Sequence, residues 1–140
     1  MAKIRHIAIS TPDPEKTAAF YQQVFGLELV ARTDSPLAKG VFLSDGHINL
    51  ALLRFKTAEA VARPEGVEYQ GLHHFGFHVE DMEEVLKRLE EQGAPRLFDR
   101  PEHEKQEGEG GLYFEIKARD PNGIMFDVSS KGWAVSKPGT

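Results

Sequence analysis

The chain has 140 residues, of which 40% are hydrophobic and 28% charged, enough for one domain with a hydrophobic core. This composition excludes a disordered or collagen-like chain, and no apolar run approaches the roughly 18 residues that span a bilayer, so we expect no membrane partner. The net charge of −5 argues against a nucleic-acid partner, and the absence of cysteine excludes disulfides and thiolate metal sites.

The first part of the chain, residues 3–54, predicts a βαβββ module. Its opening residues lack the apolar segment of a secretory signal, so we expect a cytoplasmic protein. A strand containing His6 precedes a helix that Asp13 caps, that has Pro14 at its first position and that stops at Gly26. Three strand-like segments follow, at residues 27–32, 40–44 and 47–54.

Residues 72–130 repeat this pattern. His6 and His74 are 68 residues apart, as are Asp13 and Asp81. Asp81 caps a second amphipathic helix, which is followed by strand-like segments at residues 96–99, 112–118 and 124–129. Residues 55–71 are expected to form a crossover connector and residues 131–140 a tail. Because one βαβββ module leaves a sheet face uncovered, we expect the two modules to share a core as a single α+β domain.

Two other segments have open interpretations. Residues 100–111 are charged and glycine-rich, which is typical of a solvated loop or of a mobile flap over a pocket. Trp133, in the C-terminal tail, is interpreted either as a lid over a cleft or as a contact with a partner subunit.

Strand alternation gathers polar side chains on one face of the expected sheet. His6 and His74 occupy matching positions of the two modules, Asn49 shares their face, and Asp127 is a carboxylate between two apolar neighbours. Each histidine alone is also consistent with a hydrogen-bonded core residue, and Asp127 with a turn cap. Together, two imidazoles and a carboxylate are ligands that a divalent first-row metal takes, leaving positions open for water or substrate.

Other polar residues are weaker candidates. His78 is interpreted as a hydrogen-bond partner of a ligand, a proton shuttle or a solvent-facing histidine. His47 competes with Asn49 for the fourth ligand position, and His73 is expected to be structural. Glu115 is either a catalytic base or an exposed strand glutamate.

Three motifs carry a family resemblance. They are the first strand and its helix (4–9 and 20–27), the segment Leu72–Asp81 with both histidines, and the Asp-Pro-Asn-Gly turn with the strand after it (120–128). In this order the chain resembles the vicinal oxygen chelate (VOC) superfamily over residues 3–130. That superfamily includes glyoxalase I, methylmalonyl-CoA epimerase, fosfomycin-resistance enzymes, extradiol dioxygenases and bleomycin-binding proteins.

The resemblance implies a glyoxalase-like fold, with paired modules forming an open barrel-like cup around one divalent metal ion, commonly in a homodimer. His6 and His74 match the two histidine ligands. Asp127 falls where the family usually has glutamate, and its side chain is shorter by roughly 1.5 Å of reach. Asn49 falls where glyoxalase-type members have glutamate or glutamine, so it offers no base there, which weakens an assignment as glyoxalase I.

The expected function is that of a metal-dependent enzyme acting as a Lewis acid on a small substrate with vicinal oxygens, of lyase, isomerase or epimerase type. The ion is Fe, Mn, Zn, Ni or Co, its ligands are His6, His74, Asp127 and Asn49, and the catalytic candidates are His78 and Glu115. One alternative is a non-haem iron dioxygenase. A second is a metal-free drug- or ligand-binding protein of the bleomycin-resistance type, against which the retained histidines argue.

Overall fold

The computed structural model describes residues 1–94, 97–99 and 115–136. The stretch 100–111, interpreted above as a loop or a flap, lies outside the described residues. Between the described elements of the two modules lie a short helix and a turn of 3₁₀ helix, α2 (Ala58–Val61) and η1 (Gly66–Glu68).

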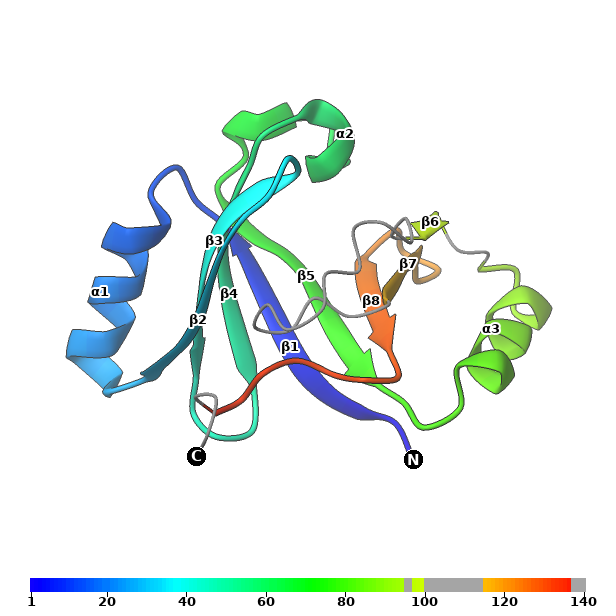
Figure 1. The fold of residues 1–140 in the computed structure, drawn as a ribbon. Helices are drawn as coiled ribbons and strands as arrows, with labels where there is room; N and C mark the ends of the chain where they lie inside the picture. The colour runs from blue at the N-terminus through cyan, green and yellow to red at the C-terminus, as the bar shows by residue number, and fades with distance from the viewer. Residues whose placement is uncertain (95–96, 100–114, 137–140) are drawn as a thin grey trace. The chain divides into compact units, whose positions relative to one another are not determined.

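The elements follow the βαβββ order twice (Figure 1). The first module contains β1 (Lys3–Ser10), α1 (Pro14–Phe25), β2 (Glu28–Asp34), β3 (Ala38–Ser44) and β4 (Asn49–Phe55). The second module contains β5 (Gly71–His78), α3 (Met82–Glu91), β6 (Phe98–Asp99), β7 (Glu115–Arg119) and β8 (Met125–Ser129).

Two compact units divide the chain. Unit 1 consists of Met1–His6 and His74–Trp133, and unit 2 consists of Ile7–His73 and Ala134–Thr140. The division runs through β1, after His6, and through β5, after His73. Unit 1 therefore contains the first residues of β1 together with most of the second module.

Unit 2 is built on antiparallel pairing of β2 with β3 and of β3 with β4, and β4 neighbours β1. Alternation along these strands sends apolar side chains to both faces of the sheet. One face packs against α1, with a core of Ala18, Val41, Leu43 and Leu52. The opposite face has a second core of Ala8, Ala38, Ala51, Leu53, Phe55 and Val61.

Unit 1 has the strand order β1-β5-β8-β7-β6. The pairing of β5 with β8 is parallel, and β7 is antiparallel to both β8 and β6. One face of these strands packs against the apolar side of α3, and its core includes Ile116, Ala118, Phe126 and Val128. The residues that alternate with them on β7 and β8, Lys117 and Asp127 among them, belong to the other face.

Caps and turns predicted from the sequence fix where these elements begin and end. The Asp13 side chain accepts a hydrogen bond from the amide of Lys16, and the Asp81 side chain accepts one from Glu84. Gly26 ends α1 in the left-handed conformation at φ 69°. No helix in the part of the chain that the structure describes has the length and hydropathy needed to cross a membrane.

Candidate metal centre

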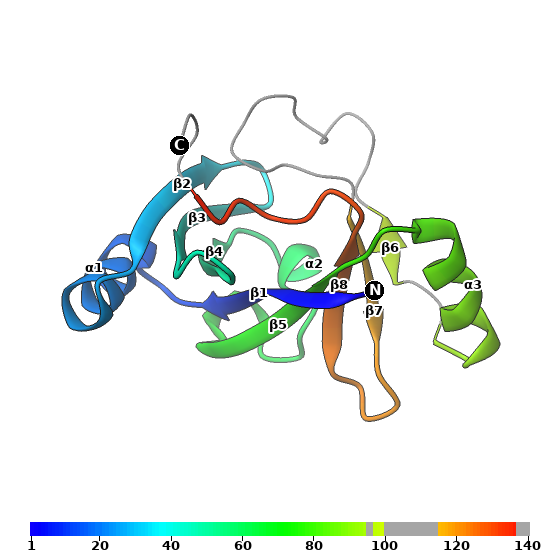
Figure 2. The same ribbon diagram turned by 90° about the horizontal axis from the view of Figure 1, so that it is seen from below.

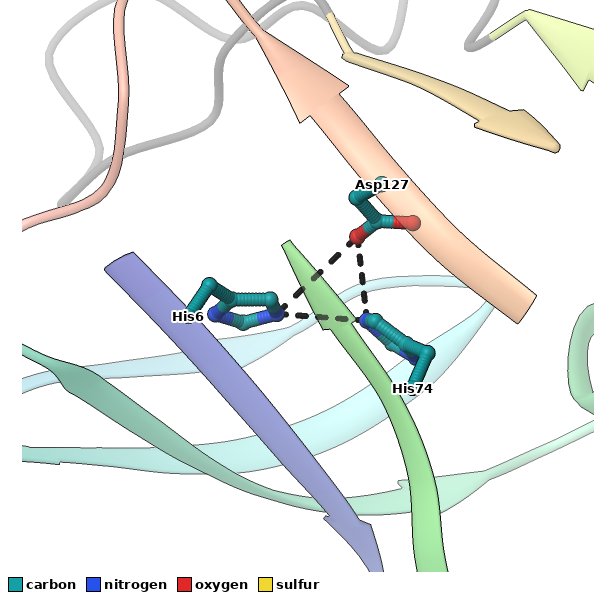
Figure 3. A group of neighbouring side chains, drawn as sticks. All are labelled: His6, His74 and Asp127. Atoms are coloured by element: carbon teal, nitrogen blue, oxygen red, sulfur yellow. Dashed lines mark hydrogen bonds and ion pairs between the residues drawn. The ribbon is translucent and has the colours of Figure 1, made fainter. Parts of the chain in front are cut away.

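Three buried side chains from different strands of unit 1 converge on one point (Figure 3). His6 comes from β1, His74 from β5 and Asp127 from β8. Strand pairing explains the convergence, because β5 lies between the other two strands and Gly76, two residues after His74, is opposite Asp127. The exposed fractions of the three residues are 3%, 6% and 1%, so the group is screened from water.

The distances between the three side chains suit a single small ion. The Nε2 atoms of His6 and His74 are 3.2 Å apart. The Oδ2 atom of Asp127 is 3.0 Å from Nε2 of His74 and 3.9 Å from Nε2 of His6. Ligand atoms about 2.0–2.2 Å from one ion are separated by about 2.8–3.6 Å at right or tetrahedral angles. Two of the three distances lie in this range, and a small shift of His6 brings the third into it.

The carboxylate of Asp127 has one oxygen without a hydrogen bond. Among the described residues, Oδ2 of Asp127 is a buried side-chain oxygen for which no hydrogen-bond partner with good geometry is present. A buried carboxylate oxygen in this condition is costly unless a cation satisfies it. The shorter aspartate reaches the two imidazoles, and its free oxygen points between them, so the residues fit a divalent ion.

Burial determines the charge state of the group. Burial lowers the pKa of His74 to about 3, and the negative charge of Asp127 only partly opposes this effect. Burial alone would raise the pKa of Asp127, but its contacts with His74 and with the Lys117 ammonium outweigh burial and hold that pKa below its usual range. At neutral pH the His74 imidazole is therefore neutral and the Asp127 carboxylate ionised, which are the forms that bind metal.

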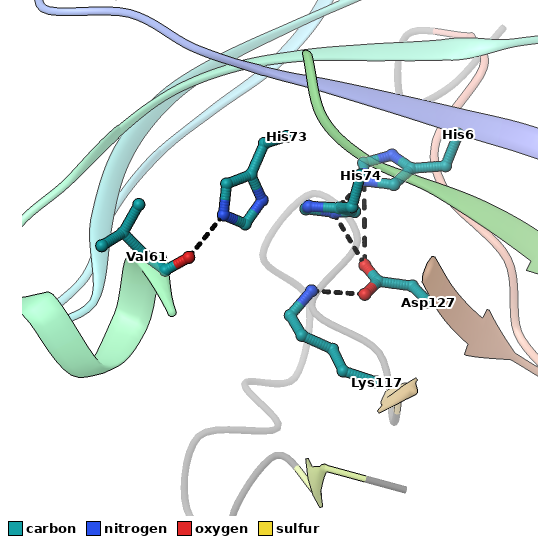
Figure 4. A network of polar contacts seen from close by, with 6 residues as sticks. All are labelled: His6, Val61, His73, His74, Lys117 and Asp127. Carbon is teal, nitrogen blue, oxygen red and sulfur yellow. Dashed lines mark hydrogen bonds and ion pairs between the residues drawn. The ribbon is translucent and has the colours of Figure 1, made fainter. Parts of the chain in front are cut away.

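Lys117 also belongs to this group, although it was not predicted from the sequence. Lys117 lies directly opposite Asp127 in the β7–β8 ladder, and its Nζ donates a hydrogen bond to Oδ1 of Asp127 (Figure 4). The side chain of Lys117 is only 11% exposed. Counting outward from the 120–123 turn expected from the sequence would put residue 117 opposite residue 126. The observed register is one residue longer, with Arg119 opposite Met125, and this puts Lys117 opposite Asp127.

Trp133 covers His6. The indole is stacked on the imidazole with ring centroids 4.6 Å apart and planes 5° from parallel. Gly76 makes room for it, because a Cβ at that position would lie 2.7 Å from Cη2 of Trp133. The sequence leaves Trp133 open as a lid or as an interface residue; within unit 1 it packs on a candidate ligand.

The two catalytic candidates also belong to unit 1. Glu115 is half-buried and shares a face of β7 with Lys117, because Ile116 between them points to the core packed on α3. His78 is half-buried at the end of β5, and its Nε2 is 3.1 Å from the carbonyl of Ser130. A carbonyl oxygen only accepts, so Nε2 of His78 donates this hydrogen bond. The catalytic roles of both residues stay predictions.

The remaining predicted residues belong to unit 2. Asn49 is buried and its amide donates to the carbonyl of Ala134 at 2.8 Å. His47 is exposed. The role of either one as a fourth ligand stays a prediction. His73 is buried, and its Nε2 donates to the carbonyl of Val61 at 2.6 Å, a structural contact.

Comparison with known proteins identifies the family. The profile of the Glyoxalase/Bleomycin resistance protein/Dioxygenase superfamily matches residues 3–128, and the chain belongs to this superfamily. An ethylmalonyl-CoA/methylmalonyl-CoA epimerase of Cereibacter sphaeroides is 30% identical over 136 residues, covering 91% of this chain and 97% of the relative. A manganese-dependent 2,3-dihydroxybiphenyl 1,2-dioxygenase of Geobacillus genomosp. 3 is 28% identical over 138 residues, covering 99% of this chain but only 38% of the relative.

Solved structures confirm the α+β fold class expected from the sequence. A hypothetical protein of Bacillus halodurans C-125 superimposes with a TM-score of 0.74 at 21% identity, covering 91% of this chain and 93% of the other. Methylmalonyl-CoA epimerase from Mycobacterium tuberculosis superimposes with a TM-score of 0.72 at 15% identity, covering 90% and 85%. The glyoxalase-like fold of βαβββ modules is thereby established.

Proposed function

We propose that the chain is a divalent-metal-dependent enzyme of epimerase, isomerase or lyase type that acts on a small substrate with two neighbouring oxygens. The observation that carries the proposal is the buried group of His6, His74 and Asp127, whose free carboxylate oxygen points between two imidazoles. The epimerase relative supports this class, because chain and relative match over nearly their whole lengths.

The three side chains of this group would hold the ion and leave its other positions for substrate. When bound, a divalent ion supplies Lewis-acid stabilisation of negative charge that develops on a substrate oxygen. Burial keeps His74 neutral and Asp127 ionised, so neither residue has to change its protonation state at neutral pH for binding. Trp133 fixes the ring plane of His6 by stacking.

Glu115 is our candidate for the proton-transferring base. It lies two residues from Lys117 on the same strand face, and the neighbour of Lys117 across the ladder is Asp127. A carboxylate near the ion can remove a proton from the carbon next to a polarised carbonyl. His78 is the second candidate, with its Nε2 held by the carbonyl of Ser130.

The test combines metal loading with proton exchange. Chelator-treated protein is reloaded separately with Mn²⁺, Fe²⁺, Co²⁺, Ni²⁺ or Zn²⁺, and incorporation of deuterium from D₂O into methylmalonyl-CoA and other acyl-CoAs is followed by NMR. We expect metal-dependent exchange, which Glu115→Gln lowers by about 10²–10⁴-fold without lowering the metal content. Exchange at the same rate in metal-free protein would contradict the proposal, and tight ligand binding without metal would favour the bleomycin-resistance type.

Non-haem iron dioxygenase is the second candidate. Two histidines and one carboxylate are also the donor set of such enzymes, and a dioxygenase is among the relatives. Oxygen uptake with catechols by the Fe²⁺- or Mn²⁺-loaded protein, together with no acyl-CoA exchange, would select this function.

We further propose that the protein is a cytoplasmic homodimer. On α1, Phe20, Val24 and Phe25 are 57%, 55% and 66% exposed. Large apolar side chains gathered on one helix favour contact with another surface, and a second copy of the chain is our proposed partner.

A further inference from the structure

Lys117 holds one oxygen of the candidate ligand Asp127. The ammonium bonds to Oδ1, while Oδ2 of the same carboxylate points to the imidazoles of His6 and His74 (Figure 4). The two cation-binding oxygens of Asp127 therefore face different partners. Because Oδ1 is turned to Lys117, Asp127 presents Oδ2 to an ion held by the two imidazoles.

The ammonium also changes the charge of the group. Imidazoles bind metal in their neutral form. Two such imidazoles, one carboxylate and one ammonium sum to zero, so a divalent ion brings the loaded site to +2; without Lys117 the loaded site would carry +1. Lys117 is 11% exposed, and Asp127 1% exposed, so solvent screens these charges weakly. The extra positive charge repels the ion and attracts a negatively charged ligand.

We propose that Lys117 is a positioning residue that keeps Asp127 a one-oxygen ligand and makes the loaded site select substrates whose two adjacent oxygens carry negative charge. The inference rests on the proposed metal-dependent function. Lys117 accordingly weakens metal binding and strengthens binding of an anionic chelating ligand, whereas a residue that served only to neutralise a buried carboxylate would affect folding alone.

The test compares Lys117→Met, of similar length but uncharged, with Lys117→Arg, which keeps the charge. Trp133 is the single tryptophan of the chain and stacks on His6, so its fluorescence reports Mn²⁺ binding. Oxalate, an anion with adjacent oxygens, serves as the ligand probe for the Mn²⁺-loaded protein. Lys87→Met, at an exposed position of α3, controls for loss of a positive charge.

We expect Lys117→Met to bind Mn²⁺ at least about tenfold more tightly and oxalate at least about tenfold more weakly, with Lys117→Arg and Lys87→Met within about threefold of the wild type. Unchanged or weaker Mn²⁺ binding by Lys117→Met, or unchanged oxalate binding, would overturn the inference. If that variant folds only with Mn²⁺, its affinity follows from the dependence of Tm on Mn²⁺ concentration.

Failure of Lys117→Met to fold at any Mn²⁺ concentration would also count against the inference, because the ion should replace the ammonium as the cation of Asp127. Absence of a metal centre, on which the proposed function depends, gives a different result, since the wild-type chain would then bind no Mn²⁺ at all.

Discussion

At the scale of single residues, the candidate site depends on two oxygens of one side chain. Asp127 directs Oδ1 to the ammonium of Lys117 and Oδ2 to the imidazoles, and it is among the most deeply buried charged groups described. A carboxylate in such a position needs a permanent positive partner, and Lys117 supplies one before any ion binds. The group can therefore stay folded without metal and keep one oxygen available for it.

His74 makes the stability of the metal-free protein depend on pH. Its folded pKa of about 3 lies below the value of 6.5 expected for an unfolded histidine. Between these values the unfolded chain binds a proton that the native chain does not, so the free energy of unfolding falls as pH falls. We expect a slope from His74 of up to about 1.4 kcal/mol per pH unit.

Denaturant unfolding of metal-free protein between pH 6.5 and pH 4.5 tests this expectation. The window lies above the pKa of about 3.9 that Asp127 has in the unfolded chain, so Asp127 binds no proton there in either state. His6 and Lys117, which also face His74, are unchanged in the His74→Gln variant. The free energy of unfolding of this variant should therefore depend less on pH. An equal pH dependence in the variant and the wild type would show that His74 is not the cause.

At the scale of elements, β5 carries a ligand and also makes room for Trp133. A methyl group at Gly76 would lie 2.7 Å from Cη2 of Trp133 and 3.0 Å from Cβ of His6. We expect Gly76→Ala to lower the free energy of unfolding by about 1–3 kcal/mol, because the indole must leave its place on His6.

A double-mutant cycle with Trp133→Phe identifies the contact responsible. The smaller ring removes the atoms that a Cβ would meet, so Gly76→Ala should cost less in the Trp133→Phe background than in the wild type. If the losses of unfolding free energy from Gly76→Ala and Trp133→Phe are additive, the methyl group disturbs something other than the indole.

Much of this architecture could be predicted from local sequence signals. The repeat of 68 residues, the Asp13 and Asp81 caps and strand alternation were enough to expect two βαβββ modules and to put His6 and His74 at matching places. Lys117 was missed because strand alternation shows that it shares a face with Glu115 but not which face that is. The answer depends on pairing across the β7–β8 hairpin (Figure 2), in which Lys117 is opposite Asp127.

The contact of Trp133 could not be predicted for a related reason. The residues before it, from Ser130 to Gly132, form no regular element, so no periodicity indicates the direction of the indole. A local hint was Gly76, a small residue where the first module has Ala8, which leaves space beside an imidazole. That space is filled by the tail of the same unit.

At the scale of the whole molecule, the chain combines the fold of its superfamily with a candidate set of metal ligands made of two histidines and an aspartate. Superfamily membership rests on the match over residues 3–128, and the candidate metal ligands come from β1, β5 and β8 of unit 1. These three strands are far apart in the sequence, so loss of a ligand should abolish metal binding while the cores of both units remain.

Two neighbouring histidines on β5 offer a matched test of that claim. His74 faces the carboxylate of Asp127, whereas His73 donates to the carbonyl of Val61. His73→Ala leaves that carbonyl without its imidazole donor and should lower the free energy of unfolding by about 1–3 kcal/mol without changing metal content.

The most direct measurement is the metal content of the wild type, His73→Ala and His74→Ala after equilibrium dialysis against Mn²⁺ or Zn²⁺ and elemental analysis. The account predicts about one ion per chain for the wild type and His73→Ala, and less than about a tenth of an ion for His74→Ala. A wild-type chain that binds no ion, or a full equivalent retained by His74→Ala, would contradict it.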